Sequence, residues 1–145
     1  MKTLKILFYT FVTIMILLAG ISLTIVLLMH IEFNLSPQDT NYFESTIILL
    51  AFIGIPGTHY LHKKRISTLP STLQIANKLS HYKNSFLIKL ATIEGLSVLT
   101  LITYILTSRE SYLYIFGIYL VTVLINYPSP SKIAEELNCE PSELN

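Results

Sequence analysis

Glu94 is the residue whose type and position most need a chemical explanation, because it lies inside the apolar stretch from Lys89 to Leu106. A charged group at the centre of a membrane-crossing helix costs about 2.5–3.5 kcal/mol or more. The glutamate stem is too short to reach the membrane surface from this depth, so we expect Glu94 to turn toward neighbouring helices. Its candidate partners are His59, Tyr60 and Asn126, which we expect near the inner ends of the second and fourth apolar segments.

Three interpretations of Glu94 are open on sequence alone. Its carboxyl can tie helices together through hydrogen bonds, bind a proton or cation during transport, or contact another subunit. Ala91 and Gly95 lie beside it at a small-xxx-small spacing, which allows the backbone of a second helix to approach closely. Lys89 is expected to extend its long stem to the nearby membrane edge instead.

His59 and His62 are three positions apart, a spacing that places two imidazoles on one face of a helix. Glu94 is the one candidate third ligand, so the pair favours interfacial histidines over a metal or haem site. The sequence contains no phosphate-binding glycine loop, no H-E-x-x-H and no G-x-S-x-G. We therefore predict no metal, no cofactor, no catalytic residue and no enzymatic activity.

The composition is that of a membrane protein. Of the 145 residues, 52% are hydrophobic and 13% are charged, whereas a soluble domain has roughly 25% charged residues. The net charge is +1 and no dense basic run occurs together with aromatics, so nucleic-acid binding is not expected. Cys139 is the only cysteine, which rules out a disulfide within the chain.

Four apolar segments are expected to cross the bilayer, so the predicted fold is an all-α, integral membrane four-helix bundle in one domain of residues 1–145. The expected spans are 7–29, 45–61, 86–106 and 112–127, followed by a tail of residues 128–145. Pro56 should kink the second span near its end. The fourth span has about 16 residues, near the lower limit for crossing, so its flanks must lie in the interface.

The placement of basic residues sets the expected orientation. The connection between the second and third spans contains Lys63, Lys64, Arg65, Lys78 and Lys83. The first connection, residues 30–44, has no lysine or arginine, and the third has only Arg109. Because cytoplasmic loops carry the excess of basic residues, both termini and the middle connection should face the cytoplasm. Lys63, Lys64 and Arg65 would then lie near anionic headgroups of a bacterial inner membrane.

The two cytoplasmic segments have helical patterns of their own. The third helix is expected to begin near Ser71 and run unbroken into the bilayer, the alternative being a separate helix lying flat in the lipid interface. In the tail, Ser129 should cap a short amphipathic helix with an apolar stripe of Ile133 and Leu137. The acidic tail could contact the basic middle connection, but we expect it to be solvated.

Three stretches, LSHYKNSFLIKLATIEG, TYILT and YPSPSKIAEELN, carry a family likeness in residues 73–144. This half of the chain resembles a group of small four-span bacterial inner-membrane proteins with no assigned activity. The resemblance implies the four-span topology and implies nothing about chemistry.

The stretch ATIEGLSVLTLI is similar to the carboxylate-bearing helix of the proteolipid subunit of rotary ATP synthases. This likeness implies that Glu94 is a proton-binding carboxyl and Ala91 a small packing residue. The chain departs from that family because no span has its glycine repeat, and because Gly95 replaces the usual alanine.

The sequence thus predicts a non-enzymatic integral membrane protein, an accessory or structural component of a membrane assembly. Its expected partners are the lipid bilayer and either other membrane proteins or further copies of itself. The alternative function is proton or cation translocation with Glu94 as the binding group.

Overall fold

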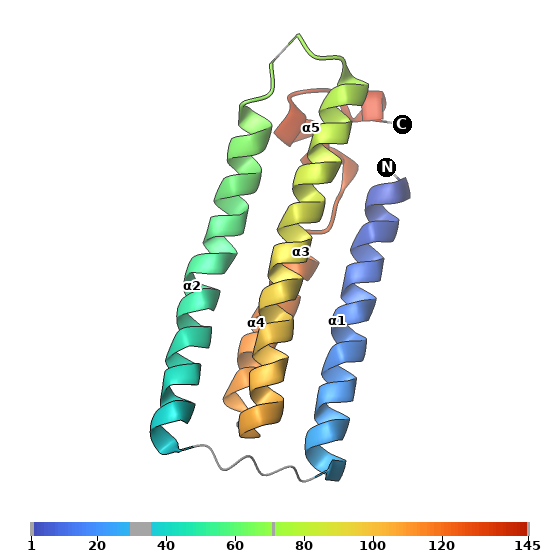
Figure 1. Cartoon of the computed structure of the whole chain (residues 1–145). Helices are drawn as coiled ribbons and strands as arrows, with labels where there is room; N and C mark the ends of the chain where they lie inside the picture. Colours follow the sequence, from blue (N-terminus) through green and yellow to red (C-terminus); the bar gives the residue numbers. More distant parts are fainter. Residues whose placement is uncertain (1, 30–35, 71, 145) are drawn as a thin grey trace.

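The computed structural model describes residues 2–29, 36–70 and 72–144, and every regular element in these ranges is helical (Figure 1). The elements are α1 (Lys2–Met29), α2 (Pro37–Ser67), α3 (Ile75–Thr107), α4 (Ser111–Ile125), α5 (Pro130–Leu137) and the short 3₁₀ helix η1 (Pro141–Leu144). The predicted all-α class is confirmed.

Local sequence explains where several helices begin and end. The Ser36 hydroxyl accepts a hydrogen bond from the backbone N–H of Asp39, 3.2 Å away, and so caps the start of α2. Ser129 caps α5 in the same way, as its position before Pro130 predicts. α3 ends where Ser108 adopts a left-handed conformation with φ of 53°.

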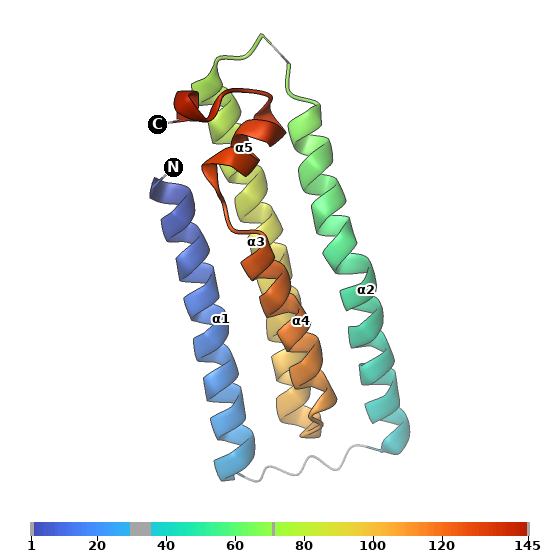
Figure 2. The same ribbon diagram turned by 180° about the vertical axis from the view of Figure 1, so that it is seen from behind.

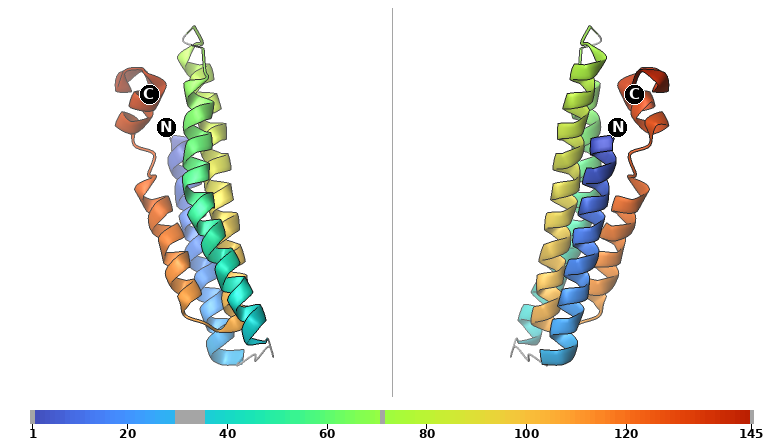
Figure 3. Two further views of the ribbon diagram at one scale, coloured as in Figure 1. Left: turned by 90° about the vertical axis from the view of Figure 1, so that its left-hand side faces the viewer. Right: turned by 90° about the vertical axis from the view of Figure 1, so that its right-hand side faces the viewer.

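α3 is the central helix of the fold. α1, α2 and α4 all pack against it, with α1 and α2 on its two flanks (Figures 1 and 2). In the most apolar stretch of each helix, 44% of the α3 residues are buried, compared with 11% in α1 and 17% in α2. α4 lies on one side of α3 (Figure 3), and Ala91, Gly95 and Ile102 on the outer side of α3 are exposed.

Three helices, α1, α2 and α3, are long and apolar enough to cross a membrane. α2 passes through Pro56 and continues to Ser67, beyond the predicted span. α3 is unbroken over 33 residues from Ile75, so the alternative of a separate helix lying flat in the interface is not formed. Ser71, where the sequence predicts the start of the third helix, lies outside the described residues. α4 has 15 residues and meets α5 at a bend of 78°, so the fourth span remains a prediction.

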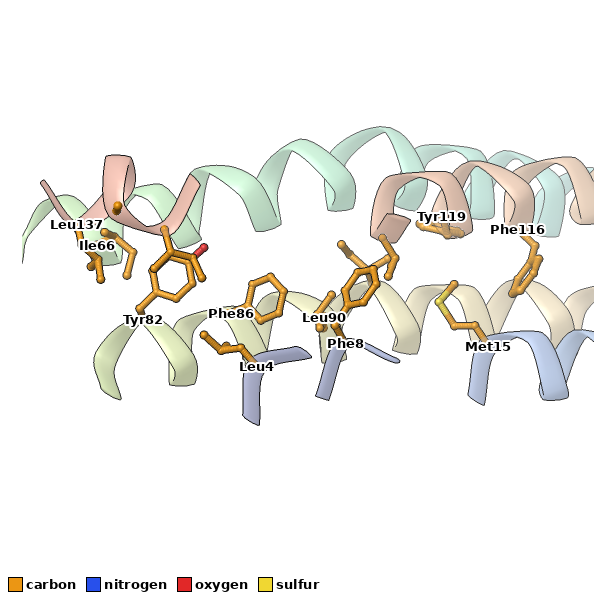
Figure 4. Packing of buried hydrophobic residues seen from close by; sticks show 14 of the residues in the cluster. Leu4, Phe8, Met15, Ile66, Tyr82, Phe86, Leu90, Phe116, Tyr119 and Leu137 are labelled. Carbon is orange, nitrogen blue, oxygen red and sulfur yellow. The ribbon is translucent and has the colours of Figure 1, made fainter. Parts of the chain in front are cut away.

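The main hydrophobic core lies between α3 and the helices around it (Figure 4). Phe8 and Met15 of α1 contribute to it, as do Leu90 of α3 and Tyr119 of α4. Each of these side chains is at most 3% exposed. In a bilayer such packing supplies van der Waals contact and not a hydrophobic driving force, because lipid tails are as apolar as leucine.

The described residues also show which loops share an end of the molecule. The start of α1, the α2–α3 connection and α5 lie together at one end, here called the tail end (Figure 1). At the opposite end the Arg109 guanidinium lies 2.7 Å from the Glu44 carboxylate, joining the α3–α4 turn to α2. Both side chains are partly exposed, so this ion pair contributes only about 0–1 kcal/mol.

Candidate functional site

Glu94 lies at the border of the buried face of α3. Its neighbours Ile93 and Ser97 are fully buried, whereas Glu94 is half-buried. Within the described ranges its carboxylate forms no hydrogen bond and no ion pair with another side chain. The structure therefore does not join Glu94 to His59 or Asn126, and Tyr60 is an exposed side chain on α2.

Asn126 instead contacts both His59 and Lys89, although the sequence predicts that Lys89 extends toward the membrane edge. The Lys89 ammonium is buried and donates a hydrogen bond to Asn126 Oδ1 at 2.7 Å. His59 Nε2 lies 3.1 Å from the same oxygen, and Asn126 Nδ2 donates to the Thr122 carbonyl at 2.6 Å. α2 and α4 thus meet α3 on its Lys89 side, about 140° around the helix from Glu94.

Both ring nitrogens of His59 have hydrogen-bond partners. Nδ1 lies 3.0 Å from the Ile55 carbonyl, and Nε2 faces the Asn126 amide oxygen. Both partners are acceptors, so a neutral imidazole can donate to only one of them, and an imidazolium can donate to both. Both ring nitrogens of His59 thus face protein acceptors on α2 and α4.

His62 forms a second polar junction, at the tail end. Its Nδ1 lies 2.9 Å from Ser85 Oγ of α3, and its Nε2 lies 3.4 Å from Glu136 Oε2 of α5. The ring also packs edge-on against Tyr82, with centroids 5.1 Å apart. One buried imidazole thus joins three helices.

The Glu136 carboxyl has an altered acidity because of this junction. Burial raises its pKa, but hydrogen bonds from His62 and Tyr82 and the charges of His62 and Lys132 outweigh burial and leave the pKa below its ordinary value. Glu136 is therefore ionised at neutral pH. The ionised carboxylate can accept a hydrogen bond from the His62 Nε2–H group.

The tail is docked, although we expected a solvated tail from the sequence. Ile133 of α5 is 0% exposed and Leu137 is 4% exposed, because both pack into the main core. The apolar stripe predicted from the sequence is the signal that indicates this docking. The acidic residue that contacts α2 is Glu136, and its partner is the buried His62. The basic residues Lys63, Lys64 and Arg65 are exposed.

The small pair Ala91 and Gly95 faces away from the other described helices. Both are exposed, and a Cβ added to Gly95 would meet nothing within 4 Å. The close approach between helices occurs at Gly54 of α2 instead, where an added Cβ would collide with the Leu96 side chain of α3. Packing of another helix against Ala91 and Gly95 stays a prediction.

A metal site has no support in the part of the chain that the structure describes. No three His, Cys, Asp or Glu side chains there come together as potential ligands. His59 and His62 each have other hydrogen-bond partners, as given above.

Comparison with known proteins gave no match: no family model, no curated protein and no solved structure is similar to this chain. The resemblance of residues 73–144 to small four-span inner-membrane proteins therefore stays a prediction, as does the likeness of the Glu94 helix to ATP synthase proteolipids.

Proposed function

We propose that this chain is a non-enzymatic integral protein of a bacterial inner membrane, an accessory or structural component of a membrane assembly. Three helices of sufficient length and apolarity support the membrane placement. So do the large apolar side chains on the outer surface, among them Phe52 at 81%, Leu28 at 75% and Ile125 at 71% exposure. In water, apolar surface of this extent would cause aggregation, whereas lipid chains cover it without cost.

The proposed orientation places the tail end in the cytoplasm. The exposed Lys63, Lys64 and Arg65 lie at that end, and the opposite end has the Arg109–Glu44 pair. The positive-inside rule then puts both termini inside the cell. α4 has 15 residues, which span about 22 Å, so in a fourth crossing its ends would lie in the headgroup region.

The observation that carries the assembly proposal is the uncovered face of α3. Ala91 and Gly95 lie on this face with the exposed Ile102, and Glu94 lies at its edge. Lipid against this face would leave a carboxyl without a polar partner, at a cost of about 2.5–3.5 kcal/mol for a charged group at mid-span. A partner helix packed over the small residues would bring a hydrogen-bond donor to Glu94 and remove this cost.

Purification in mild detergent tests the assembly. We expect a particle larger than the 16.5 kDa chain plus its detergent, reduced to monomer by Gly95→Leu, which fills the space for the partner. Gly20→Leu is the matched control, because an added Cβ at Gly20 of α1 also meets nothing within 4 Å. A stable monomer in the unmodified protein, or equal loss with both variants, would contradict the proposal.

A second candidate function is proton or cation binding at Glu94. It is favoured by the row of buried hydroxyl side chains on the same helix, Ser97, Thr100 and Thr103, which begins one turn from Glu94. Glu94→Gln separates the two functions in reconstituted vesicles. The glutamine retains hydrogen bonding and should preserve the assembly, whereas it cannot exchange a proton and would abolish ion flux. Unchanged ion flux would remove the transport candidate.

A further inference from the structure

A small groove opens between α2 and α3 at the tail end, and its polar lining is basic. Three of the lining side chains can carry positive charge and three carry hydroxyls: His62, Arg65 and Lys89, with Thr58, Ser85 and Thr92. None of the residues that line it is acidic. The groove therefore has the charge of a site for an anion.

Lys89 gives the groove an uncompensated buried charge. Its side chain is 6% exposed, and the one hydrogen bond of its ammonium is to the neutral amide oxygen of Asn126. No carboxylate lies within ion-pair distance of it in the described ranges. A lysine ammonium has three donors, so two of them have no hydrogen-bond partner among the described residues. Burying such a charge is costly unless an anion lies close to it.

The neighbouring charges do not remove this imbalance. Lys132 and Glu136 of α5 both act on Lys89, with opposite signs, and Glu136 is already hydrogen-bonded to His62. The groove hydroxyls are also engaged, since Thr58 and Thr92 donate to carbonyls of their own helices. Arg65 and Lys89 are therefore the groups that can bind a further anion.

The surroundings of the groove indicate where that anion comes from. Leu61 and Ile88 also line it and are 53% and 48% exposed, so an apolar surface borders the two cations. A ligand that matches both features has a phosphate next to hydrocarbon chains. A guanidinium fork recognises phosphate through two parallel hydrogen bonds, and an ammonium recognises it as a point charge.

We propose that the groove binds the phosphate of an anionic phospholipid in the cytoplasmic leaflet, with Arg65 and Lys89 as its ligands. The proposal rests on the membrane orientation given above and adds a specific lipid class to it. The acyl chains would lie along Leu61 and Ile88. Lys63 and Lys64, which do not line the groove, would contribute only diffuse attraction.

The test is native mass spectrometry of the purified protein in detergent, titrated with phosphatidylglycerol, phosphatidylcholine or inorganic phosphate. We expect one tightly bound phosphatidylglycerol, at least tenfold preferred over phosphatidylcholine, and no competition from millimolar inorganic phosphate. Arg65→Gln should abolish the preference. Lys64→Gln is the matched control, because it removes the same charge one residue away and should retain it.

Two results would overturn the proposal. Equal loss with Arg65→Gln and Lys64→Gln would show diffuse charge attraction, and displacement of the lipid by inorganic phosphate would show a site for free anions. Lys89→Met removes the second proposed ligand, so this variant should retain the helicity of the unmodified protein and lose the preference for phosphatidylglycerol. Arg65→Gln should leave the Gly95-dependent assembly intact, so failure of lipid binding and failure of the assembly can be told apart.

Discussion

The docking of α5 can be tested by truncating Ile133, the side chain at its centre. α5 has only 8 residues, and an isolated helix of that length is not stable in water. Its order must therefore come from packing, to which Ile133 and Leu137 contribute fully buried side chains. Ile133→Ala should cost about 2–5 kcal/mol of docking free energy, as is typical for a buried isoleucine.

The polar junction should contribute less to docking than this packing. The His62–Glu136 hydrogen bond is 3.4 Å long, and the Glu136 side chain is 33% exposed. A hydrogen bond of this kind contributes about 0.5–1.5 kcal/mol net. Since about 1.4 kcal/mol corresponds to a factor of ten, Ile133→Ala should reduce protection of the α5 amides about 30-fold or more. Glu136→Gln should reduce it only about 2- to 10-fold.

Amide hydrogen exchange of peptides covering residues 130–139, measured in lipid nanodiscs, gives these factors directly. Glu135→Ala is the control, because Glu135 is exposed on the same helix and should change protection little. Exchange in α3 should be the same in all variants. If Ile133→Ala leaves α5 protected, or if Glu136→Gln has the larger effect, packing is not what holds the tail.

Further predictions concern the polar groups and the helix contacts. The folded-state pKa of Glu136 is below its ordinary value of 4.5, so the Glu136 carboxylate contributes to docking above that pH, and this contribution is lost as the pH falls through the lowered pKa. Amide exchange measured from pH 6 to pH 3.5 should therefore show that α5 loosens. Glu136→Gln should remove this pH dependence. Gly54→Val should lower the melting temperature by several degrees because the added carbons collide with the Leu96 side chain of α3. Gly57→Val should lower it less, because nothing lies within 4 Å of an added Cβ there. Equal shifts would argue against a close approach at Gly54. Asn126→Leu removes the hydrogen-bond acceptor of buried Lys89 and should destabilise the protein by about 1.5–3 kcal/mol in denaturant unfolding. Asn126→Leu combined with Lys89→Met should recover much of that loss, and no recovery would contradict the assigned contact.

Much of the helical framework could be predicted from the sequence, because local chemistry determines it. Three long apolar segments predict three long helices, and Ser129 before Pro130 predicts the start of α5. The unbroken α3 follows from the lack of a helix breaker in residues 75–107.

The site could not be predicted to the same degree, because it depends on which faces of the helices meet. Lys89 was expected to extend toward the membrane edge, but α2 and α4 approach that side of α3 and Asn126 supplies an acceptor. Glu94, on the other flank, has no such neighbour in the described part of the chain. Helical periodicity places these two residues on different faces but does not say which face other helices cover.

The placement of α3 in the bilayer can be measured on native residues with methyl-labelled alanine in nanodiscs. Ala91 lies at the middle of α3 and Ala76 near its tail end, and both are exposed. We predict that a water-soluble gadolinium chelate broadens the Ala76 methyl signal and leaves the Ala91 signal sharp. Equal broadening of both signals would mean that water surrounds this helix along its length, and the membrane placement would be wrong.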